Sequence, residues 1–453
     1  MKTDPEILPV AIIGAGPVGL AAAAHLLERG EPPLILEAGP SVGHSVRQWG
    51  HVRMFSPWRY NIDPASRRLL ETVVWDEPCG EKLPTGGEIV DEYLQPLAEI
   101  DAIAEALRLG HRVTAVTREG LDKVRSHGRA ERPFVIRTLD AAGAPATYRA
   151  RAVIDASGTW KGPNPMGADG LRVPGEEAFA SRIDYGIPDL AGAREEDFAG
   201  ARVLVVGSGH SSFNAVLDLL RVKETHPATT ITWAMRKAQL GNVFGGGAAD
   251  ALPERGELGQ KVRRAVDSGA VTLLHPMAIE GVTEGDGDTA LRVQASVGGE
   301  GLELPVDRIV VATGFRPDFA FSREIRLRLD PALECAEKLG PLIDPNEHSC
   351  GSVPPHGAKE LAHPEPGYYV VGMKSYGRAP TFLLATGYEQ VRSVVAEIAG
   401  DPEAAARVEL ALPETGVCSL NEAPQEVAPS CGGETQKVDP SPSVPSRKTS
   451  CCG

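Results

Sequence analysis

The chain has 453 residues, of which 42% are hydrophobic and 24% charged, and its formal net charge is −15. This length exceeds one ordinary hydrophobic core, so we expect a globular protein of at least two domains. The acidic balance argues against nucleic acids and anionic membranes as partners, because both attract clustered positive charge. The low-charge stretch 11–27 is too short for a membrane span and follows acidic residues, so we expect no span, no signal sequence and a cytoplasmic location.

The first predicted elements form a βαβ unit around a glycine-rich turn, in the run VAIIGAGPVGLAAAAHLLERGEPPLILEAG that begins at Val10. Its expected elements are a strand at 10–13, a helix at 20–29 and a strand at 34–36. Gly14 allows a tight bend, Gly16 lets backbone N–H groups approach a pyrophosphate, and Gly19 lets the helix press against the sheet.

Two further features of this unit favour a dinucleotide. The start of the expected helix directs its unpaired backbone N–H groups and the positive end of its dipole towards an anion. Glu37 lies 18 residues past Gly19, where a carboxylate accepts hydrogen bonds from a ribose that lacks a 2′-phosphate. A glycine-rich turn that binds nothing is the alternative, and it leaves Glu37 unexplained.

The segment 43–60 is dense in arginine, histidine and aromatic residues. Its members Arg47, Trp49, Phe55 and Ser56 are candidates to cover the cofactor. The alternative is a packed loop with solvated arginines. Farther on, the spacing of apolar residues predicts a helix within 83–100.

Three predicted strands follow. Residues 111–117 and 134–139 are rich in β-branched residues and alternate in polarity. Residues 149–158 form an apolar strand that ends in Ala156-Ser157-Gly158, where the backbone must pass close to another group. The run 160–174 is rich in glycine and proline, as in a linker.

The opening pattern then recurs in ARVLVVGSGHSSFNAVLDLL, with a second turn whose first glycine, Gly207, lies 193 residues after Gly14. Ser212 replaces the third glycine and is still small. The next strand, at 230–235, ends in Arg236-Lys237 instead of an acid, which favours the 2′-phosphate of NADPH. A solvated basic pair is the alternative.

The strand ending of 153–158 is repeated at Asp307–Gly314, so the chain is expected to return to the first domain near Ile309. A strand at 368–372 and a helix at 381–399 complete that domain. The predicted fold is α/β, with two Rossmann-like dinucleotide-binding domains and the second inserted in the first. The expected limits are 1–192 and 306–400 for the first domain, 193–305 for the second, and 401–453 for a tail that is disordered from about 413.

A site for an unphosphorylated dinucleotide together with one for NADPH predicts FAD in the first domain and hydride delivery from the second. The chain resembles the two-dinucleotide-binding flavoproteins, and among them the flavin-containing monooxygenases, in GAGPVG, GSGHSS, ASGTW and ATGFRPD. It is also similar to a bacterial subgroup often encoded beside arsenic-resistance genes. Neither Ser157–Trp160 nor Asp184–Gly186 reproduces the Phe-x-Gly-x-x-x-His fingerprint of the monooxygenases.

The expected cofactor contacts fall into two sets. Those to FAD are Gly14, Gly16, Pro17, Val18, Gly19, Glu37, Arg47, Trp49, Phe55, Ser56, Val113, Ala156, Gly158, Gly314 and Gly372. Those to NADPH are Gly207, Ser208, Gly209, His210, Ser211, Ser212, Arg236 and Lys237.

The resemblance implies a monooxygenase in which NADPH reduces FAD and one oxygen of O₂ passes, through a flavin C4a-hydroperoxide, to a soft nucleophile such as a trivalent arsenical or an organosulfur compound. The flavin carries the chemistry, so no catalytic side chain is required. Neither a CxxC nor a CxxxxC pair occurs in the sequence, although relatives that reduce disulfides carry one. A homodimer remains open.

The seven cysteines are unevenly spaced, which is not the pattern of a secreted disulfide framework. Four lie near the end: Cys418, Cys431, Cys451 and Cys452. The last pair, in SCCG, is similar to that of mercuric reductases, and thiolates bind soft ions such as Hg²⁺ or trivalent arsenic. This leaves two alternatives, a metal-ion or disulfide reductase that works through the tail and a non-catalytic redox or metal sensor; the tail thiols could also have no role.

Overall fold

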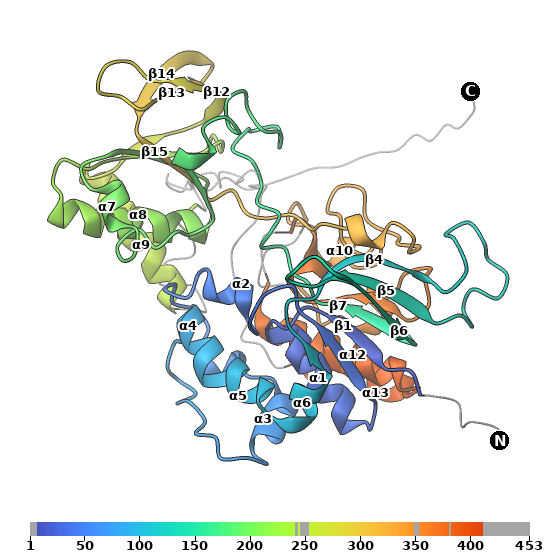
Figure 1. Ribbon diagram of the computed structural model, residues 1–453. Coiled ribbons are helices and arrows are strands. Elements are labelled where there is room, and N and C mark those ends of the chain that lie inside the picture. The colour runs from blue at the N-terminus through green and yellow to red at the C-terminus, as the bar shows by residue number, and fades with distance from the viewer. Residues whose placement is uncertain (1–6, 241–242, 245–252, 348–352, 380–381, 411–453) are drawn as a thin grey trace, which may run out of the picture. The chain divides into compact units, whose positions relative to one another are not determined.

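The computed structural model describes residues 7–240, 243–244, 253–347, 353–379 and 382–410 (Figure 1). Its strands form two five-stranded sheets and two three-stranded sheets. The pairs of both five-stranded sheets are parallel, as the α/β prediction requires. Within the described ranges, no helix has the length and apolar character needed to cross a membrane.

The first parallel sheet has the order β16-β7-β1-β2-β3. Its strands are β1 (Val10–Ile13), β2 (Pro33–Leu36), β3 (Leu107–Arg108), β7 (Ala152–Asp155) and β16 (Tyr368–Val370). All residues of β1, β7 and β16 are buried. A strand that is covered on both faces reads as a continuous apolar run, which is why the sequence predicted these strands well.

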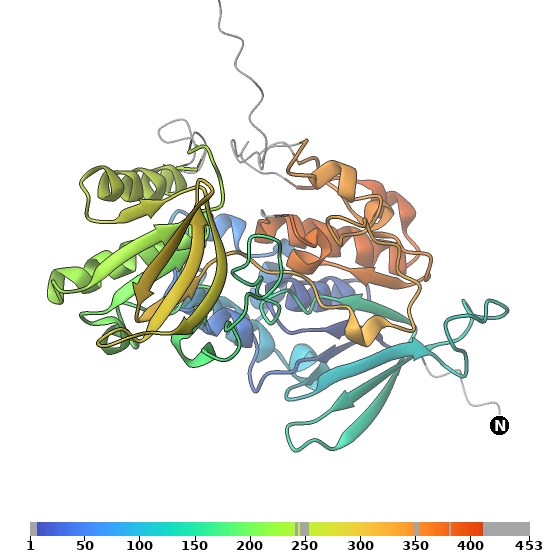
Figure 2. The same ribbon diagram turned by 90° about the horizontal axis from the view of Figure 1, so that it is seen from above.

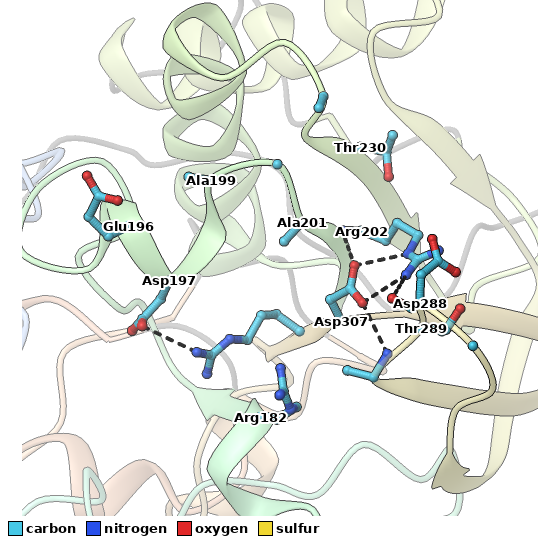
Figure 3. Close-up of a pocket in the computed structure, with 15 residues that line it drawn as sticks. Arg182, Glu196, Asp197, Ala199, Ala201, Arg202, Thr230, Asp288, Thr289 and Asp307 are labelled. Atoms are coloured by element: carbon cyan, nitrogen blue, oxygen red, sulfur yellow. Dashed lines mark hydrogen bonds and ion pairs between the residues drawn. The ribbon is translucent and has the colours of Figure 1, made fainter.

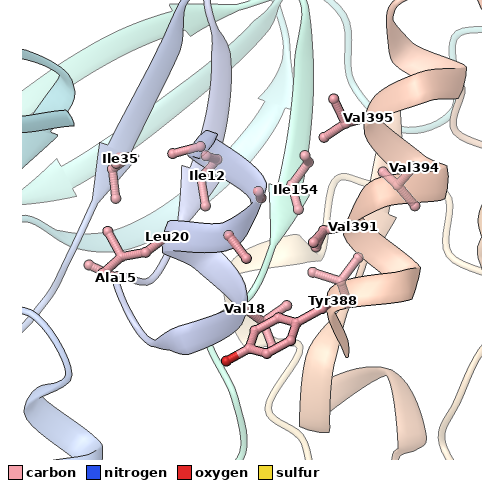
Figure 4. Close-up of a cluster of buried hydrophobic side chains, with 14 of the residues drawn as sticks. Ile12, Ala15, Val18, Leu20, Ile35, Ile154, Tyr388, Val391, Val394 and Val395 are labelled. Carbon is pink, nitrogen blue, oxygen red and sulfur yellow. The ribbon is translucent and has the colours of Figure 1, made fainter. Parts of the chain in front are cut away.

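Helices α1 (Pro17–Glu28) and α12 (Leu384–Ile398) pack against each other and against this sheet (Figure 4). Val18 and Leu20 of α1 lie in the same buried cluster as Tyr388 and Val391 of α12. Each fully buried apolar side chain of this size contributes about 1.5–3 kcal/mol. The contact therefore joins the first helix of the chain to the last long one.

A three-stranded antiparallel sheet packs on the first parallel sheet through a separate apolar cluster. Its strands are β4 (Arg112–Arg118), β5 (Phe134–Leu139) and β6 (Pro145–Ala150). Phe134 and Ile136 of β5 meet Ala11 and Val153 of the parallel strands in that cluster. The predicted strands at 111–117 and 134–139 are confirmed to within one residue.

Short helices fill the connection from β2 to β3. They are α2 (His44–Arg47), η1 (Trp58–Tyr60), α3 (Pro64–Leu70), α4 (Gly86–Glu88), the π-helical η2 (Ile89–Leu94), α5 (Gln95–Ala98) and α6 (Asp101–Ala106). The helix expected within 83–100 begins at a capping box of Thr85 and Glu88, in which each side chain accepts a hydrogen bond from the other's backbone N–H.

The second parallel sheet has the order β11-β10-β9-β15-β8. Its strands are β8 (Ile183–Tyr185), β9 (Arg202–Val206), β10 (Thr230–Ala234), β11 (Thr272–Leu274) and β15 (Arg308–Val311). The helices that follow or flank these strands are α7 (Glu195–Phe198), α8 (His210–Thr225) and α9 (Pro253–Asp267). A small antiparallel sheet, gold in Figure 2, connects β11 to β15 through β12 (Met277–Glu284), β13 (Leu291–Val297) and β14 (Glu300–Val306).

The second parallel sheet extends beyond the limits 193–305 expected for the second domain. Ile183 of β8 and Leu204 of β9 both pair with Ile309 of β15, so both outer segments belong to the second sheet. The chain therefore leaves that sheet after Val311, and the expected return near Ile309 lies within it. Sheet membership depends on strand pairing, which a single apolar strand does not reveal, so the expected domain limits stay a prediction.

The two segments that connect the parallel sheets pair with each other. Asn164 N–H donates to the carbonyl of Gly314, Arg316 N–H donates to that of Gly162, and Pro163 and Phe315 form a β-bridge. The ring of Trp160 stacks on that of Phe315 with centroids 4.8 Å apart. The run expected to be a linker is thus an ordered, paired crossing.

The last described elements close the first parallel unit. They are η5 (Ala320–Ser322), α10 (Gly340–Ile343), α11 (Ala358–Leu361), η6 (Gly372–Tyr376) and α13 (Pro402–Ala406). The short helix η3 (Ala180–Arg182) instead leads into β8 of the second sheet. Helix α13 falls within the expected tail at 401–453. It packs there because Asp401 caps it and Arg392 of α12 donates to the carbonyl of Ala404.

A buried charge cluster holds the loop before β16 to the antiparallel sheet. Arg118 and Arg129 both donate to the Glu365 carboxylate, at 2.8 Å each, and the Glu365 side chain is fully buried. Burial opposes ionisation of Glu365, but hydrogen bonds from Arg129 and Arg118 outweigh it and lower the pKa of the carboxyl group below its usual value. Glu365 therefore stabilises the fold above its unfolded pKa of about 4.3, and this contribution is lost as the pH falls through the lower folded pKa.

Replacing this carboxylate should destabilise the fold. Glu365→Gln leaves Arg118 and Arg129 buried without a counter-charge, so we expect the free energy of unfolding at pH 7 to fall by about 3 kcal/mol. Urea denaturation measures this change. Glu119→Gln, which breaks the exposed pair with Arg149, is the matched control and should cost less than about 1 kcal/mol. Equal midpoints for the two variants would contradict the prediction.

Candidate functional site

The first glycine-rich turn lies at the carboxyl end of the first parallel sheet, between β1 and α1. Gly14 has φ +105°, and a Cβ there would lie 2.7 Å from the carbonyl oxygen of Ala156. At Gly19 a Cβ would lie 2.0 Å from the Gly14 carbonyl oxygen, whereas at Gly16 it would meet nothing within 4 Å. Gly14 and Gly19 are therefore required for packing, and Gly16 leaves open space where a ligand can approach.

The start of α1 and the end of β2 face this turn. Gly16 is the N-cap of α1, Pro17 occupies the first turn, and no side chain caps the helix. The Glu37 carboxylate accepts hydrogen bonds from Ala15 N–H at 2.7 Å and from Gly39 N–H at 2.6 Å, which hold it against the turn. Each carboxylate oxygen keeps a further lone pair for a ribose hydroxyl. The residues present therefore fit a dinucleotide such as FAD.

The ends of β7 and β16 form the other wall. Gly372 has φ +68°, and a Cβ there would lie 3.3 Å from the side chain of Val18. Its N–H donates to Gln390 of α12 at 2.8 Å. Gly158 has φ +69° and open space at its Cβ position. The structure thus brings Ala156 against Gly14 and Gly372 against Val18, with Gly158 two residues after Ala156. Their contact with FAD stays a prediction.

The four candidates from the segment 43–60 are engaged in different contacts. Arg47 forms an ion pair of 2.8 Å with Asp91. The ring of Trp49 packs closely on Gly86, so that a Cβ atom added at Gly86 would lie 2.7 Å from it. Ser56 is buried, and its hydroxyl donates to the side-chain oxygen of Asn61 at 2.9 Å. These contacts match the alternative of a packed loop for Arg47, Trp49 and Ser56.

Phe55 has a different neighbour. Its ring centroid lies 5.0 Å from that of His210, the first helical residue after the second glycine-rich turn. The structure thus brings Phe55 to the expected NADPH turn.

Two other expected FAD contacts lie outside these walls. Val113 belongs to β4 and pairs with Thr138 of β5. Two residues earlier, His111 N–H donates to the carbonyl of Glu37 at 2.7 Å. Gly314 lies in the paired crossing and has φ +87°.

The second turn repeats the geometry of the first. Gly207 has φ +137°, and a Cβ there would lie 2.3 Å from the carbonyl oxygen of Ala312 at the end of β15. Gly209 is the N-cap of α8, with no side-chain cap, and its Cβ position is open. Ser212 is fully buried and its hydroxyl donates to the Gly209 carbonyl at 2.6 Å. Ser208, His210 and Ser211, all partly buried, complete the turn.

The basic pair after β10 lies on the same edge of the second sheet. The Arg236 side chain is exposed and donates one hydrogen bond of 3.2 Å to the carbonyl of Ala168, and Lys237 is partly buried. A guanidinium has five N–H donors, so this contact leaves others for a phosphate.

The predicted tail thiols Cys418, Cys431, Cys451 and Cys452 lie outside the described residues. Among the residues that are described, the free cysteines are Cys79, which is exposed, and Cys335, which is buried. Burial raises the pKa of the Cys335 thiol to about 12, with the Asp330 carboxylate adding to the shift. The described ranges contain no group of three or more His, Cys, Asp or Glu side chains able to hold a metal.

A cavity of about 920 Å³ lies at the opposite edge of the second sheet (Figure 3). Its lining includes Arg202, Asp307 and Arg308, at the amino ends of β9 and β15. Arg202 forms an ion pair of 3.0 Å with Asp307, and Arg308 pairs with Asp197 at 3.3 Å. In parallel α/β sheets ligands bind at the carboxyl ends of the strands, so we do not assign the cofactor to this cavity.

Sequence reasoning missed a buried polar cluster beside the first turn. Asp155 ends β7, and its carboxylate accepts from Lys374 Nζ at 2.8 Å and from the Tyr368 hydroxyl at 3.2 Å. Burial, and then the negative Asp155, raise the pKa of Tyr368 well above its usual value. The available signal was an acid at the end of an otherwise apolar strand, AVID, and a lysine within the apolar run 368–376.

The comparisons with known proteins agree with this geometry. Residues 11–349, about three quarters of the 453, match the family described as pyridine nucleotide-disulphide oxidoreductase. An indole-3-pyruvate monooxygenase, YUCCA1 of Oryza sativa subsp. japonica, is 31% identical over 46% of this chain and 44% of its own length. The chain thus spans less than half of that relative. A ferredoxin–NADP reductase of Granulibacter bethesdensis is 27% identical over 73% of this chain and 77% of its own length.

Solved structures show the same fold. The bacillithiol disulfide reductase Bdr (YpdA) of Bacillus cereus superimposes with a TM-score of 0.65 at 18% identity, over 87% of this chain and 99% of that one. A flavin-containing monooxygenase of Stenotrophomonas maltophilia superimposes with a TM-score of 0.54 at 21% identity, over 87% of this chain and 98% of that one. The chain belongs to the pyridine nucleotide-disulphide oxidoreductase family, and it is a flavoprotein oxidoreductase with a Rossmann-like α/β fold that uses FAD and NADPH.

Proposed function

We propose that this enzyme is a monooxygenase that transfers one oxygen atom of O₂ to a soft nucleophile, such as a trivalent arsenical or an organosulfur compound, with NADPH as the electron donor. The cysteine chemistry carries the proposal. Of the two free cysteines in the described residues, the buried Cys335 has a thiol whose raised pKa keeps it protonated at neutral pH, and Cys79 is exposed. A protonated thiol is a poor nucleophile, so within the described residues Cys335 is poorly suited to a dithiol relay, which favours an acceptor that meets the flavin directly.

FAD would lie along the first turn. Gly14, Gly16, Gly19 and the start of α1 would hold its pyrophosphate, and Glu37 its ribose. The walls at Ala156, Gly158 and Gly372 would flank its remaining length. When bound, FAD would supply the redox chemistry that connects hydride donation by NADPH to two-electron transfer to the acceptor. The task of the chain is to bind and orient both cofactors.

NADPH would lie on the second turn. Backbone N–H groups of Ser208 to Ser211 would hold the pyrophosphate, and Arg236 with Lys237 would hold the 2′-phosphate. Phe55 packs on His210 at this turn, so Phe55, which lies in the connection between β2 and β3, would border NADPH.

A reductase is the second candidate. It is favoured by the ferredoxin–NADP reductase of G. bethesdensis, which covers more of this chain than YUCCA1 does. The acceptor would then be a metal ion, a disulfide or a protein electron carrier, and the tail thiols Cys451 and Cys452 would present a soft ion to the flavin. Because the chain is an oxidoreductase, we do not retain the non-catalytic sensor.

Oxygen stoichiometry tests the monooxygenase. With methylarsenite, arsenite or a thioether as substrate, we expect one O₂ and one NADPH to be consumed per oxygenated product, because one oxygen atom enters the product and the other forms water. An oxygen electrode and NADPH absorbance measure this ratio. Substrate-dependent NADPH oxidation that is equally fast without O₂ would remove the monooxygenase.

The tail separates the two candidates. If the flavin meets its acceptor directly, Cys451→Ser with Cys452→Ser should change the rate less than twofold. The measurement is steady-state NADPH oxidation with arsenite and with Hg²⁺, in air and under argon. A loss of more than tenfold under argon would instead establish the tail-dependent reductase.

The basic pair should decide the choice between NADPH and NADH. Arg236→Gln removes charge-assisted hydrogen bonds to the 2′-phosphate, which are worth about 1.5–3 kcal/mol, so we expect KM for NADPH to rise about 10- to 100-fold and KM for NADH to change little. Arg221→Gln, which removes an exposed arginine paired with Asp218 on α8, is the matched control. Equal effects on both nucleotides would contradict a 2′-phosphate contact.

A further inference from the structure

The strongest unexplained feature is the ion pair between Lys374 and Asp155. The two side chains are 1% and 0% exposed, and Lys374 Nζ lies 2.8 Å from the Asp155 carboxylate. Nζ also donates to the Ser157 hydroxyl at 3.1 Å, and that hydroxyl donates to Asp155 at 2.6 Å. The rings of Phe319 and Phe321 lie 5.0 and 4.4 Å from Nζ. The ammonium group is therefore enclosed by one carboxylate, one hydroxyl and two aromatic faces.

This pair joins the ends of β7 and β16, which together form one wall of the proposed flavin site. Asp155 and Ser157 flank Ala156, whose carbonyl oxygen lies against Gly14. Lys374 lies two residues after Gly372, in η6, and Val371 N–H donates to the Asp155 carbonyl at 2.9 Å. Ser157 is exposed while the two charges beneath it are buried. The charges thus lie directly under the surface that borders the first turn.

Stability alone does not account for such a pair. Removing a lysine and a carboxylate from water is energetically costly, and well-packed apolar residues of similar volume often stabilise a fold as well or better. The pair does, however, place one positive and one negative charge in a region of low dielectric constant, where each acts strongly on nearby charge. Reduction of a flavin by two electrons and one proton leaves a negative charge that such groups can stabilise or destabilise.

We propose that Lys374 and Asp155 are positioning residues that set the reduction potential of the flavin by balancing each other's charge. The positive charge of Lys374 offsets the negative charge of Asp155. The ends of β7 and β16 are therefore held together without a net negative charge beside the flavin site. The proposal rests on the flavin site proposed above and not on the identity of the electron acceptor.

Charge variants test the balance. Lys374→Met leaves Asp155 uncompensated and should shift the midpoint potential of the bound flavin to more negative values. Asp155→Asn leaves Lys374 uncompensated and should shift it to more positive values. The double variant should return towards the wild-type potential. The potentials are measured by dye equilibration on the purified holoenzyme, together with FAD content and the melting temperature.

Opposite signs separate this role from a structural one, because loosening the walls would move both single variants in the same direction. Glu365→Gln removes an equally buried charge before the other end of β16 and should lower the melting temperature while leaving the potential unchanged. Lys374→Arg keeps the positive charge and should retain the wild-type potential. If Lys374→Met fails to fold, a positive shift in Asp155→Asn together with an unchanged potential in Lys374→Arg still supports the charge balance, and any other result contradicts it.

Shifts of equal sign, or unchanged potentials at full FAD content, would overturn the charge balance and leave the proposed function intact. Wild-type protein that binds no FAD would instead overturn the flavin site itself.

Discussion

The structure depends on one close contact that occurs twice. In each parallel sheet, the first glycine of the turn lies against the carbonyl oxygen that ends the neighbouring strand, Ala156 for Gly14 and Ala312 for Gly207. A Cβ atom at either glycine would come within 2.7 Å of that oxygen. This contact brings the helix start to the carboxyl edge of the sheet and keeps the edge clear of side chains, so both cofactor sites follow from the absence of two methyl groups.

Buried charge is placed on both sides of β16. Before the strand, Glu365 balances two arginines and holds the antiparallel sheet. After it, Lys374 balances Asp155 beside the first turn. Both clusters join segments that are far apart in the chain, but only the second borders the proposed flavin site. The same physical device therefore has a structural consequence at one end and, by our proposal, a redox consequence at the other.

Relatives with this scaffold include both monooxygenases and reductases, because the fold supplies cofactor binding and leaves the acceptor to local features. In the described part of this chain, the local feature is the state of two cysteines, one buried and protonated and one exposed. That chemistry favours an acceptor that meets the flavin without a thiol relay, in line with the monooxygenase that we propose.

The sequence alone determined the two glycine-rich turns, the acid after β2 and the basic pair after β10, because each meets a local requirement for backbone conformation, strand burial or charge. Tertiary structure decided what depends on distant pairing. Strands β8 (183–185) and β15 (308–311) pair with each other in the second sheet, and the ring of Phe55 packs against that of His210. Lys374 met Asp155, 219 residues away, because β16 and β7 are neighbours in space. No local pattern encodes such partners, since each side chain read by itself is compatible with many surroundings.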